Sequence, residues 1–253
     1  MPWHSQPGVL PCVESAVLIL LHETLFMEIR KHLSQVDLFK DFTVGQLEEI
    51  TKIVSDKEYK RGQQIFAEGD DGVGFYIVIR GRVKVFKVSP DGKEQIMHIF
   101  GPGQPFAEVP VFEGSRYPAN AEAMENCRLF FFTKNAFVNL IHENPSLAMN
   151  MLASMSQRLK QFSRMIESLS LKEVPGRLAS YLLYLSDRNG SIDEFALDIA
   201  KSQLASFLGT IPETLSRIFT KMTSRKLIRI KGPQVTILDR TGLEDLAEGE
   251  SKL

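Results

Sequence analysis

The sequence predicts an α+β fold with an N-terminal β jelly roll, a long dimerisation helix and a C-terminal winged helix-turn-helix. Three observations support this fold: short alternating strands between glycine turns, then a heptad pattern of apolar residues, then two short helices around a glycine turn. The expected boundaries are 1–26 for an N-terminal extension, 27–143 for the β-barrel, 144–172 for the dimerisation helix and 173–253 for the winged domain.

The composition is that of an ordinary globular chain. Its 253 residues, 43% hydrophobic and 24% charged, suffice for about two domains. The longest apolar run, 16–21, is far shorter than the ~20 residues that cross a bilayer, so we expect a cytoplasmic protein with no membrane partner. Cys12 and Cys127 are too few for a four-thiolate site within one chain, so we expect no iron–sulfur cluster.

The N-terminal extension differs in composition from the rest of the chain. It combines prolines and a glycine with a short apolar run that has no clear partner. Helical spacing first appears after Met27, at Ile29, Leu33 and Val36. We therefore hypothesise that translation starts at Met27 and that residues 1–26 are an extension.

The barrel follows a capped helix. Thr43 and Gln46 have the spacing of a capping box, and apolar residues recur behind them with helical spacing. Strands are expected in 62–66, 74–88, 95–100 and 126–132, broken by turns at 69–72, 81, 90–92, 101–103 and 113–114. Many short strands with glycine corners are typical of a jelly-roll barrel.

The long helix is expected to start at Asn144 and Pro145, a cap residue followed by a proline at the first helical position. Its apolar residues are spaced alternately by four and three: Ala148, Leu152, Met155, Leu159, Phe162, Ile166 and Leu169. A helix packed on its own barrel would also carry an apolar stripe, but polar residues such as Arg158 leave this stripe narrow. We therefore interpret it as the seam of a homodimeric coiled coil.

The C-terminal domain begins with Pro175 and a helix over 177–185. The segment 198–231 then predicts a helix, a turn at Gly209 and a second helix, and a hairpin wing follows over 227–239. Seven Lys or Arg stand against two acidic residues in 198–231, and this local excess of positive charge attracts phosphate. The acidic segment 244–250 is expected to be a solvated end.

Three motifs carry a resemblance to a known family: GDDGVGFYIVIRGRVKVF at 69–86, FAEVPVFEG at 106–114 and IPETLSRIFTKM at 211–222. Together with the order of the parts, they resemble the bacterial CRP/FNR transcription regulators over about 28–246. The resemblance implies a cyclic-nucleotide-binding-like barrel, a homodimer, double-stranded DNA and RNA polymerase as partners, and no enzymatic activity. Segments 106–123 and 168–183 look most like the DNR/HcpR-type regulators of nitrosative stress.

The second helix of the pair carries the residues that we expect to bind bases. Arg217 has the donors for a guanine edge, Glu213 can accept from cytosine, and Ser216 can contact either neighbour. In FNR-like regulators a Glu-x-x-Ser-Arg pattern binds a TTGA-type half-site, so the resemblance implies a TTGA...TCAA palindrome. The alternative for Glu213 is a capping box with Thr210, in which the carboxylate bonds the backbone instead.

The remaining DNA-contact candidates flank these three residues. Lys201, Gln203 and Lys221 are expected either to hold phosphate or to solvate their own helices. Thr210 is a further candidate on the DNA side of the turn.

The family's cyclic-nucleotide site requires a Gly-Glu pair and an Arg-Ser pair, and both are altered here. Ala107-Glu108 and Tyr117-Pro118 stand at those places, and a one-residue slip turns Arg116 away from the pocket. These changes argue against cyclic AMP. The effector pocket that we expect nevertheless comprises Phe106, Glu108, Arg116, Tyr117, Leu159 and Phe162.

The DNR resemblance implies haem and nitric oxide sensing instead, with His32 and His98 as the candidate haem ligands. The paired histidines of DNR align with Val36 and Asp37, which departs from that pattern. Two alternatives remain: a regulator that responds to a cyclic nucleotide, and a cupin-type metal enzyme. The barrel lacks the HxH pair of a cupin. The expected mechanism is an effector that shifts the coiled-coil helices near 159–169 and re-aims the DNA-reading helices.

Overall fold

The computed structural model describes residues 23–253, so most of the expected extension, residues 1–22, lies outside the described residues. A helix covers 23–33, and Met27 lies inside it rather than at its start. The 3-10 turn η1 (Asp37–Phe39) and helix α2 (Val44–Ile53) follow. The capping box is confirmed, because the Thr43 hydroxyl accepts from the amide of Gln46 and the Gln46 side chain accepts from the amide of Thr43, at 3.4 and 2.8 Å.

The barrel of the described chain is built from two four-stranded antiparallel sheets. The first has the order β1 (Ser55–Tyr59), β8 (Cys127–Thr133), β3 (Gly74–Arg80) and β6 (Pro105–Phe106). The second has the order β2 (Gln64–Phe66), β7 (Asn120–Ala123), β4 (Val83–Val88) and β5 (Glu94–Phe100). The sequence pattern missed β1, β6 and β7, because β1 is polar and largely exposed and the other two are very short.

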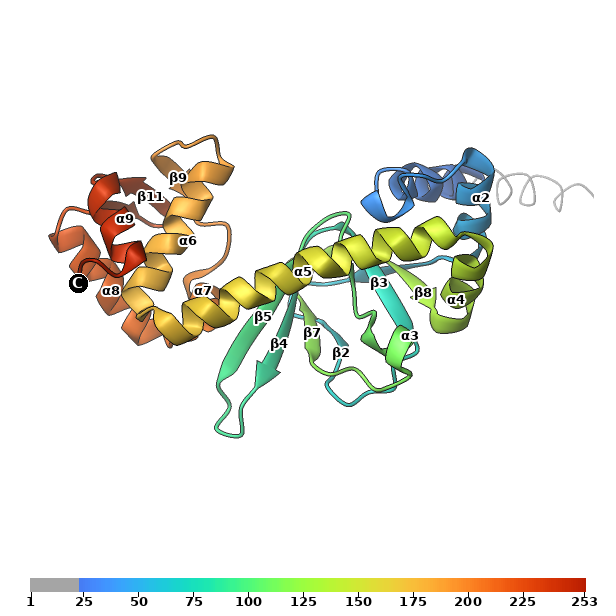
Figure 1. Cartoon of the computed structure of the whole chain (residues 1–253), viewed down its shortest axis with the longest axis horizontal. Helices are drawn as coiled ribbons and strands as arrows, with labels where there is room; N and C mark the ends of the chain where they lie inside the picture. The colour runs from blue at the N-terminus through green and yellow to red at the C-terminus, as the bar shows by residue number, and fades with distance from the viewer. Residues whose placement is uncertain (1–22) are drawn as a thin grey trace, which may run out of the picture.

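Three helices complete this half of the molecule. They are α3 (Val109–Glu113), α4 (Lys134–Glu143) and α5 (Pro145–Leu171), of which only α5 was expected. Figure 1 shows α5 running from the barrel to the C-terminal domain. It begins at Pro145 as predicted, although the Asn144 side chain makes no capping bond and instead contacts Gln46 and the carbonyl of Leu140.

The apolar stripe of α5 splits into two rows with different surroundings. Leu152, Leu159 and Ile166, one heptad apart, are 56%, 67% and 65% exposed. Met155 and Phe162, the other row, are half-buried against the same chain. The narrow seam predicted from the sequence is therefore only partly free, and the alternative of a helix packed on its own barrel accounts for the second row.

The C-terminal domain contains α6 (Val174–Arg188), β9 (Glu194–Ala196), α7 (Lys201–Phe207), α8 (Pro212–Ser224), β10 (Ile228–Lys231), β11 (Gln234–Ile237) and α9 (Arg240–Glu248). The expectation of a solvated acidic end is wrong, because α9 covers most of it and buries Leu246 against α6. Gly176 permits this packing, since a Cβ there would lie 2.9 Å from the carbonyl oxygen of Leu246. No helix within 23–253 is long and apolar enough to span a bilayer.

The C-terminal domain packs against the barrel through α7 and β5. The Gln95 side chain of β5 donates to the carbonyl oxygen of Phe207 at 3.4 Å. Met124 of the barrel is buried in the hydrophobic core of the C-terminal domain. The two halves therefore share both polar and apolar contacts at their junction.

Candidate nucleic-acid interface

The two helices α7 and α8 form the predicted helix-turn-helix, with Gly209 between them. Gly209 has φ +67°, the left-handed conformation that favours glycine. On α8, one side buries Leu215, Ile218, Phe219 and Met222 in the domain core. Because these residues recur with helical spacing, the opposite side of α8 is left to face solvent.

The three expected base-reading residues lie on that exposed side. Glu213, Ser216 and Arg217 are exposed, three or four positions apart or adjacent. Arg217 donates one hydrogen bond to the Thr214 hydroxyl at 3.1 Å. Glu213 has no hydrogen bond or ion pair with any residue from 23 to 253. All three polar ends are thus available to a ligand outside the chain.

The capping-box alternative for Glu213 is wrong. Helix α8 has Ile211 at its N-cap and Pro212 in its first turn, and no side chain caps it. Thr210 lies one residue earlier and is 9% exposed, with its amide bonded to the carbonyl of Ala205. The same burial removes Thr210 from the surface on which we expected it to contact DNA.

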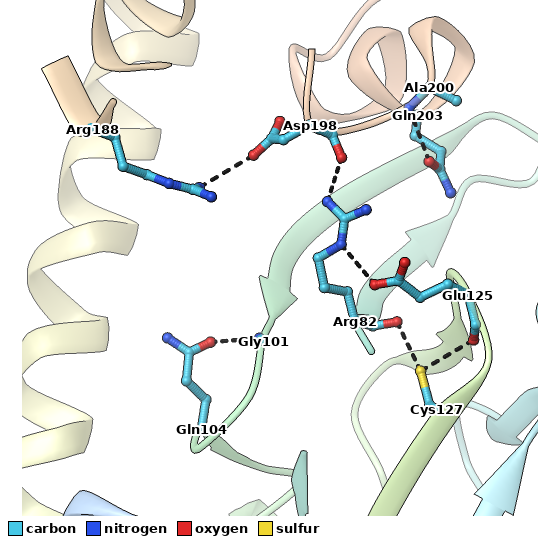
Figure 2. Close-up of polar contacts among 9 residues, drawn as sticks. All are labelled: Arg82, Gly101, Gln104, Glu125, Cys127, Arg188, Asp198, Ala200 and Gln203. Carbon is cyan, nitrogen blue, oxygen red and sulfur yellow. Dashed lines mark hydrogen bonds and ion pairs between the residues drawn. The ribbon is translucent and has the colours of Figure 1, made fainter. Parts of the chain in front are cut away.

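The flanking DNA-contact candidates differ in their exposure to solvent and in their contacts within the chain. Lys201 is exposed, and its ammonium lies 5.3 Å from the centroid of the Phe219 ring, at the junction of α7 and α8. Lys221 is exposed on the last turn of α8. Gln203 is half-buried. Its side-chain oxygen Oε1 accepts from the backbone amide of Ala200 at 3.3 Å, so it caps α7 (Figure 2).

The hairpin wing and the local positive charge also favour this side of the domain as the nucleic-acid interface. Strands β10 and β11 pair as a hairpin whose turn contains Gly232 at φ +62°, and β9, which the sequence pattern missed, pairs with β11. The seven basic residues between 198 and 231 are all exposed. Asp198, by contrast, is held by Tyr181 and Arg188 at the junction with the barrel. The exposed surface therefore carries a stronger positive field than the sequence alone implies.

Comparison with known proteins shows to which family the chain belongs. Residues 56–144 match the cyclic nucleotide-binding domain, and residues 176–246 match the Crp-like helix-turn-helix domain. The chain is 30% identical over 191 residues to the cyclic AMP receptor protein of Thermus thermophilus, covering 76% of this chain and 87% of that protein. The chain belongs to the CRP/FNR family of transcription regulators.

Further relatives of this CRP/FNR regulator agree. It is 28% identical over 211 residues to the CRP-like cAMP-activated global transcriptional regulator of Mycobacterium tuberculosis, covering 82% of this chain and 94% of that one. The solved structure of FixK2 from Bradyrhizobium japonicum has the same fold, with a TM-score of 0.66 at 22% identity over 77% of this chain and 97% of that one. The matched C-terminal domain is a helix-turn-helix, and the relatives named above are transcription regulators.

The barrel interior of this CRP/FNR regulator is packed with aromatic side chains. Phe106 and Tyr117, two expected effector contacts, are 0% and 3% exposed. Phe66 stacks on Tyr117 at a centroid separation of 3.9 Å, and Tyr76 stacks on Phe106 at 5.3 Å. The Tyr117 hydroxyl donates to the carbonyl of Gly74 at 2.9 Å. Phe106 and Tyr117 therefore take part in aromatic stacking inside the barrel.

The other expected pocket residues do not come together. Arg116 is exposed beside Asp71, at 3.6 Å, and turns away from the interior as its one-residue offset suggested. Leu159 faces solvent, whereas Phe162 lies near His98, with ring centroids 6.2 Å apart. The six residues therefore do not line a single cavity.

Arg158 is a site residue that the sequence pattern missed. It was interpreted as a polar position outside the coiled-coil seam, yet its guanidinium enters the barrel and pairs with buried Glu108. It also donates to the carbonyl of Pro105 at 2.6 Å and lies 4.8 Å from the Phe100 ring centroid. Within the described chain, Oε2 of Glu108 is the buried side-chain oxygen that lacks a partner. The sequence around Arg158 carries no signal for this role, because its partner Glu108 lies far away in the chain.

The two candidate haem-ligand histidines lie in different surroundings. The Nε2 atom of His32 is 3.7 Å from Glu28, and its ring packs edge-on against Phe130. His98 lies on β5, where burial and the nearby Arg158 guanidinium lower its pKa from 6.5 to about 4. The structure does not bring the two together. Between residues 23 and 253, no group of three His, Cys, Asp or Glu side chains is placed to hold a metal ion, so the described chain offers no cupin-type cluster.

Proposed function

We propose that this CRP/FNR regulator acts as a homodimer that binds a TTGA...TCAA palindrome under the control of a small effector. The observation that carries the DNA part is the exposure of Glu213, Ser216 and Arg217 on the solvent side of α8, where Arg217 has one side-chain bond, to Thr214. Buried polar groups need partners, whereas these exposed ones keep their bonding capacity for a base edge.

Each of the three has a specific role in the proposal. Arg217 donates in a bidentate manner to the O6 and N7 atoms of guanine, Glu213 accepts from N4 of cytosine, and Ser216 contacts the neighbouring base. Lys201 and Lys221 neutralise phosphates on either side and set the register. Such phosphate contacts add affinity without sequence preference.

The homodimer is supported by the exposed row of α5. Leu152, Leu159 and Ile166 lie one heptad apart and are each more than half exposed. Two copies related by a twofold axis would bury this row against itself. The same axis would set the recognition helices about 34 Å apart, the spacing of successive major grooves on one face of DNA.

For the effector we propose haem, with His98 as its protein ligand and nitric oxide as the signal, in line with a nitrosative-stress role and with RNA polymerase as the partner of the DNA-bound form. His98 fits this group, since its imidazole is neutral at pH 7 and has no hydrogen-bond partner within residues 23–253. Haem would supply the iron that binds the gas. A cyclic nucleotide is the second candidate, supported by the match of 56–144 to the cyclic nucleotide-binding domain.

Fluorescence anisotropy with a labelled TTGA...TCAA duplex and a random duplex at fixed salt tests the DNA part. Arg217→Ala should lose about 1–3 kcal/mol of affinity, roughly 5- to 150-fold, on the palindrome only. Arg229→Ala, on the wing, is the matched control and should weaken both duplexes about equally. Equal loss on both duplexes for Arg217→Ala would contradict a base-reading role.

Light scattering tests the homodimer. Leu159→Glu places a charge in the exposed row and should shift the protein to monomers at micromolar concentration. Lys160→Glu, adjacent but outside the row, changes the charge of the same helix and should remain dimeric. A dimeric Leu159→Glu variant would place the interface elsewhere.

An anaerobic absorption titration tests the effector. Haemin should give a saturating Soret band at one equivalent per chain, and nitric oxide should then change the affinity for the palindrome. His98→Ala should lose the stoichiometric band while keeping the basal DNA affinity. Diffuse haemin absorption with no effect on DNA would leave only the DNA part of the proposal.

A further inference from the structure

A cleft of about 560 Å³ lies where the barrel, α5 and the DNA-binding domain meet. We propose that this junction cleft is a binding site for a planar aromatic anion, whose occupancy controls how the DNA-binding domain docks on the barrel. The residues that would recognise it are His98, Phe162, Arg164, Tyr181, Tyr184 and Phe207. The inference rests on the proposed effector control and places the effector at this junction, around His98.

The cleft has the size and lining of a small-molecule site. Its volume lies within the range of about 300–1,000 Å³ that is typical of ligand pockets, which are mainly apolar and aromatic with a few polar groups. Phe162 comes from α5, Tyr181 and Tyr184 from α6, and Phe207 from α7. The Tyr181 and Phe207 rings are 5.9 Å apart. Aromatic walls from three helices favour a planar ligand that can stack on them.

The charged groups favour an anion. Three arginines line the cleft against a single carboxylate within the described chain, that of Asp198. Arg164 is exposed and has no ion-pair partner anywhere in 23–253, and Arg188 contacts Asp198 at 3.3 Å while remaining 57% exposed. Asp198 pairs with Arg188 and Glu125 pairs with Arg82 at 3.0 Å, so among the described residues Arg164 supplies the unpaired positive charge of the cleft. A carboxylate or phosphate is the group that guanidinium donors bind best.

His98 adds an imidazole to the same cleft. Its ring is half-buried between Phe100 and Phe162, with centroid separations of 4.4 and 6.2 Å. An imidazole can form hydrogen bonds or bind a metal. It therefore suits either the edge of a heterocycle or the metal of a metallated ring.

The walls of the cleft also connect the two halves of the chain. Figure 2 shows Arg82, from the turn between β3 and β4, reaching the main-chain oxygen of Asp198 while it pairs with Glu125 at 3.0 Å. Arg188 approaches the same aspartate from the end of α6. An anion that recruits Arg82 or Arg188 competes with these bonds. Its binding would therefore change the docking of the helix-turn-helix on the barrel.

Titration of the full-length protein with the fluorescent aromatic sulfonate 8-anilinonaphthalene-1-sulfonate tests the site. Wild type should bind one equivalent per chain. Arg164→Ala and Tyr184→Ala should each weaken binding at least about tenfold, because each removes a charged or stacking contact. Arg61→Ala, an exposed barrel arginine outside the cleft, is the control and should bind like wild type. Equal affinity in all four proteins would overturn the proposal.

Competition then identifies the source of the ligand. Displacement of the dye by haemin indicates a tetrapyrrole, and displacement by cyclic AMP indicates a nucleotide. Displacement by neither would make the cleft an adventitious dye site only and would also overturn the proposal. Palindrome binding by ligand-free Arg164→Ala should match wild type. A variant that loses dye but keeps DNA affinity supports the cleft, whereas a wild type that does not bind the palindrome contradicts the proposed function instead.

Discussion

Replacing Gly209 by alanine perturbs the turn of the helix-turn-helix at the point where it meets the rest of the molecule. Gly209 has φ +67°, so any other residue pays a conformational cost of about 1–2 kcal/mol there. A Cβ would also lie 2.9 Å from Cδ2 of Leu169 on α5 and 3.1 Å from Oε1 of Gln95 on β5. Both neighbours must move, which we expect to add about 1 kcal/mol.

Gly190 provides a matched control in the same domain. It has φ +86°, and a Cβ there would meet no atom within 4 Å. Gly190→Ala should therefore lose only the conformational part, about 1–2 kcal/mol, whereas Gly209→Ala should lose about 2–3 kcal/mol. The difference between the two variants measures the contact between the turn, α5 and the barrel.

Native-state amide hydrogen exchange is the appropriate assay, because it reports the free energy of opening of each domain separately. Peptides covering α7 and α8 should show the larger loss of protection in Gly209→Ala. Barrel peptides should change little in either variant, apart from those that contain Gln95. Equal loss in the two variants would refute the argument that the turn is packed against α5 and the barrel.

Two further predictions concern buried ionisable side chains, His98 and the Arg158–Glu108 pair. Burial and Arg158 lower the pKa of His98 from 6.5 to about 4 in the folded chain, so stability present above pH 6.5 should be lost as pH falls towards 4, by up to about 3 kcal/mol. Urea unfolding at pH 7 and pH 4.5 should show that part of the loss disappear in His98→Gln; an unchanged loss would contradict the assignment. Arg158→Met leaves Glu108 buried and unpaired and should cost about 3–5 kcal/mol in the same assay. Adding Glu108→Gln should recover much of that loss, and failure to recover it would show that Arg158 stabilises the barrel in another way.

Much of the fold was predictable because its signals are local. The Thr43 capping box, the start of α5 at Pro145 and the turn at Gly209 each depend on a few adjacent residues. The same holds for the exposed side of α8, since the helical repeat places its buried residues on one face and Glu213 and Arg217 on the opposite face. The predictions that Glu213 and Arg217 read bases stay predictions, and the structure shows only that both are free to do so.

Other features were not predictable from short windows. Strand β1 is polar because it lies at an edge of its sheet, so it lacks the alternation that marks a half-buried strand. The acidic C-terminal segment appeared solvated because its charges outnumber its apolar residues, yet a few leucines suffice to pack α9 on α6. Thr210 appeared to be a surface residue until the geometry of the turn buried it.

The sequence by itself determined the order of the parts, the family and the residues on the solvent side of α8, because periodicity, glycine turns and clustered charge act over a few residues. The tertiary structure decided which row of α5 faces solvent, that Arg158 enters the barrel and that aromatic rings stack in its interior. It also brought His98, Arg164 and Tyr184 to one cleft. These outcomes depend on packing between segments that are far apart in the chain, and no local pattern records that packing.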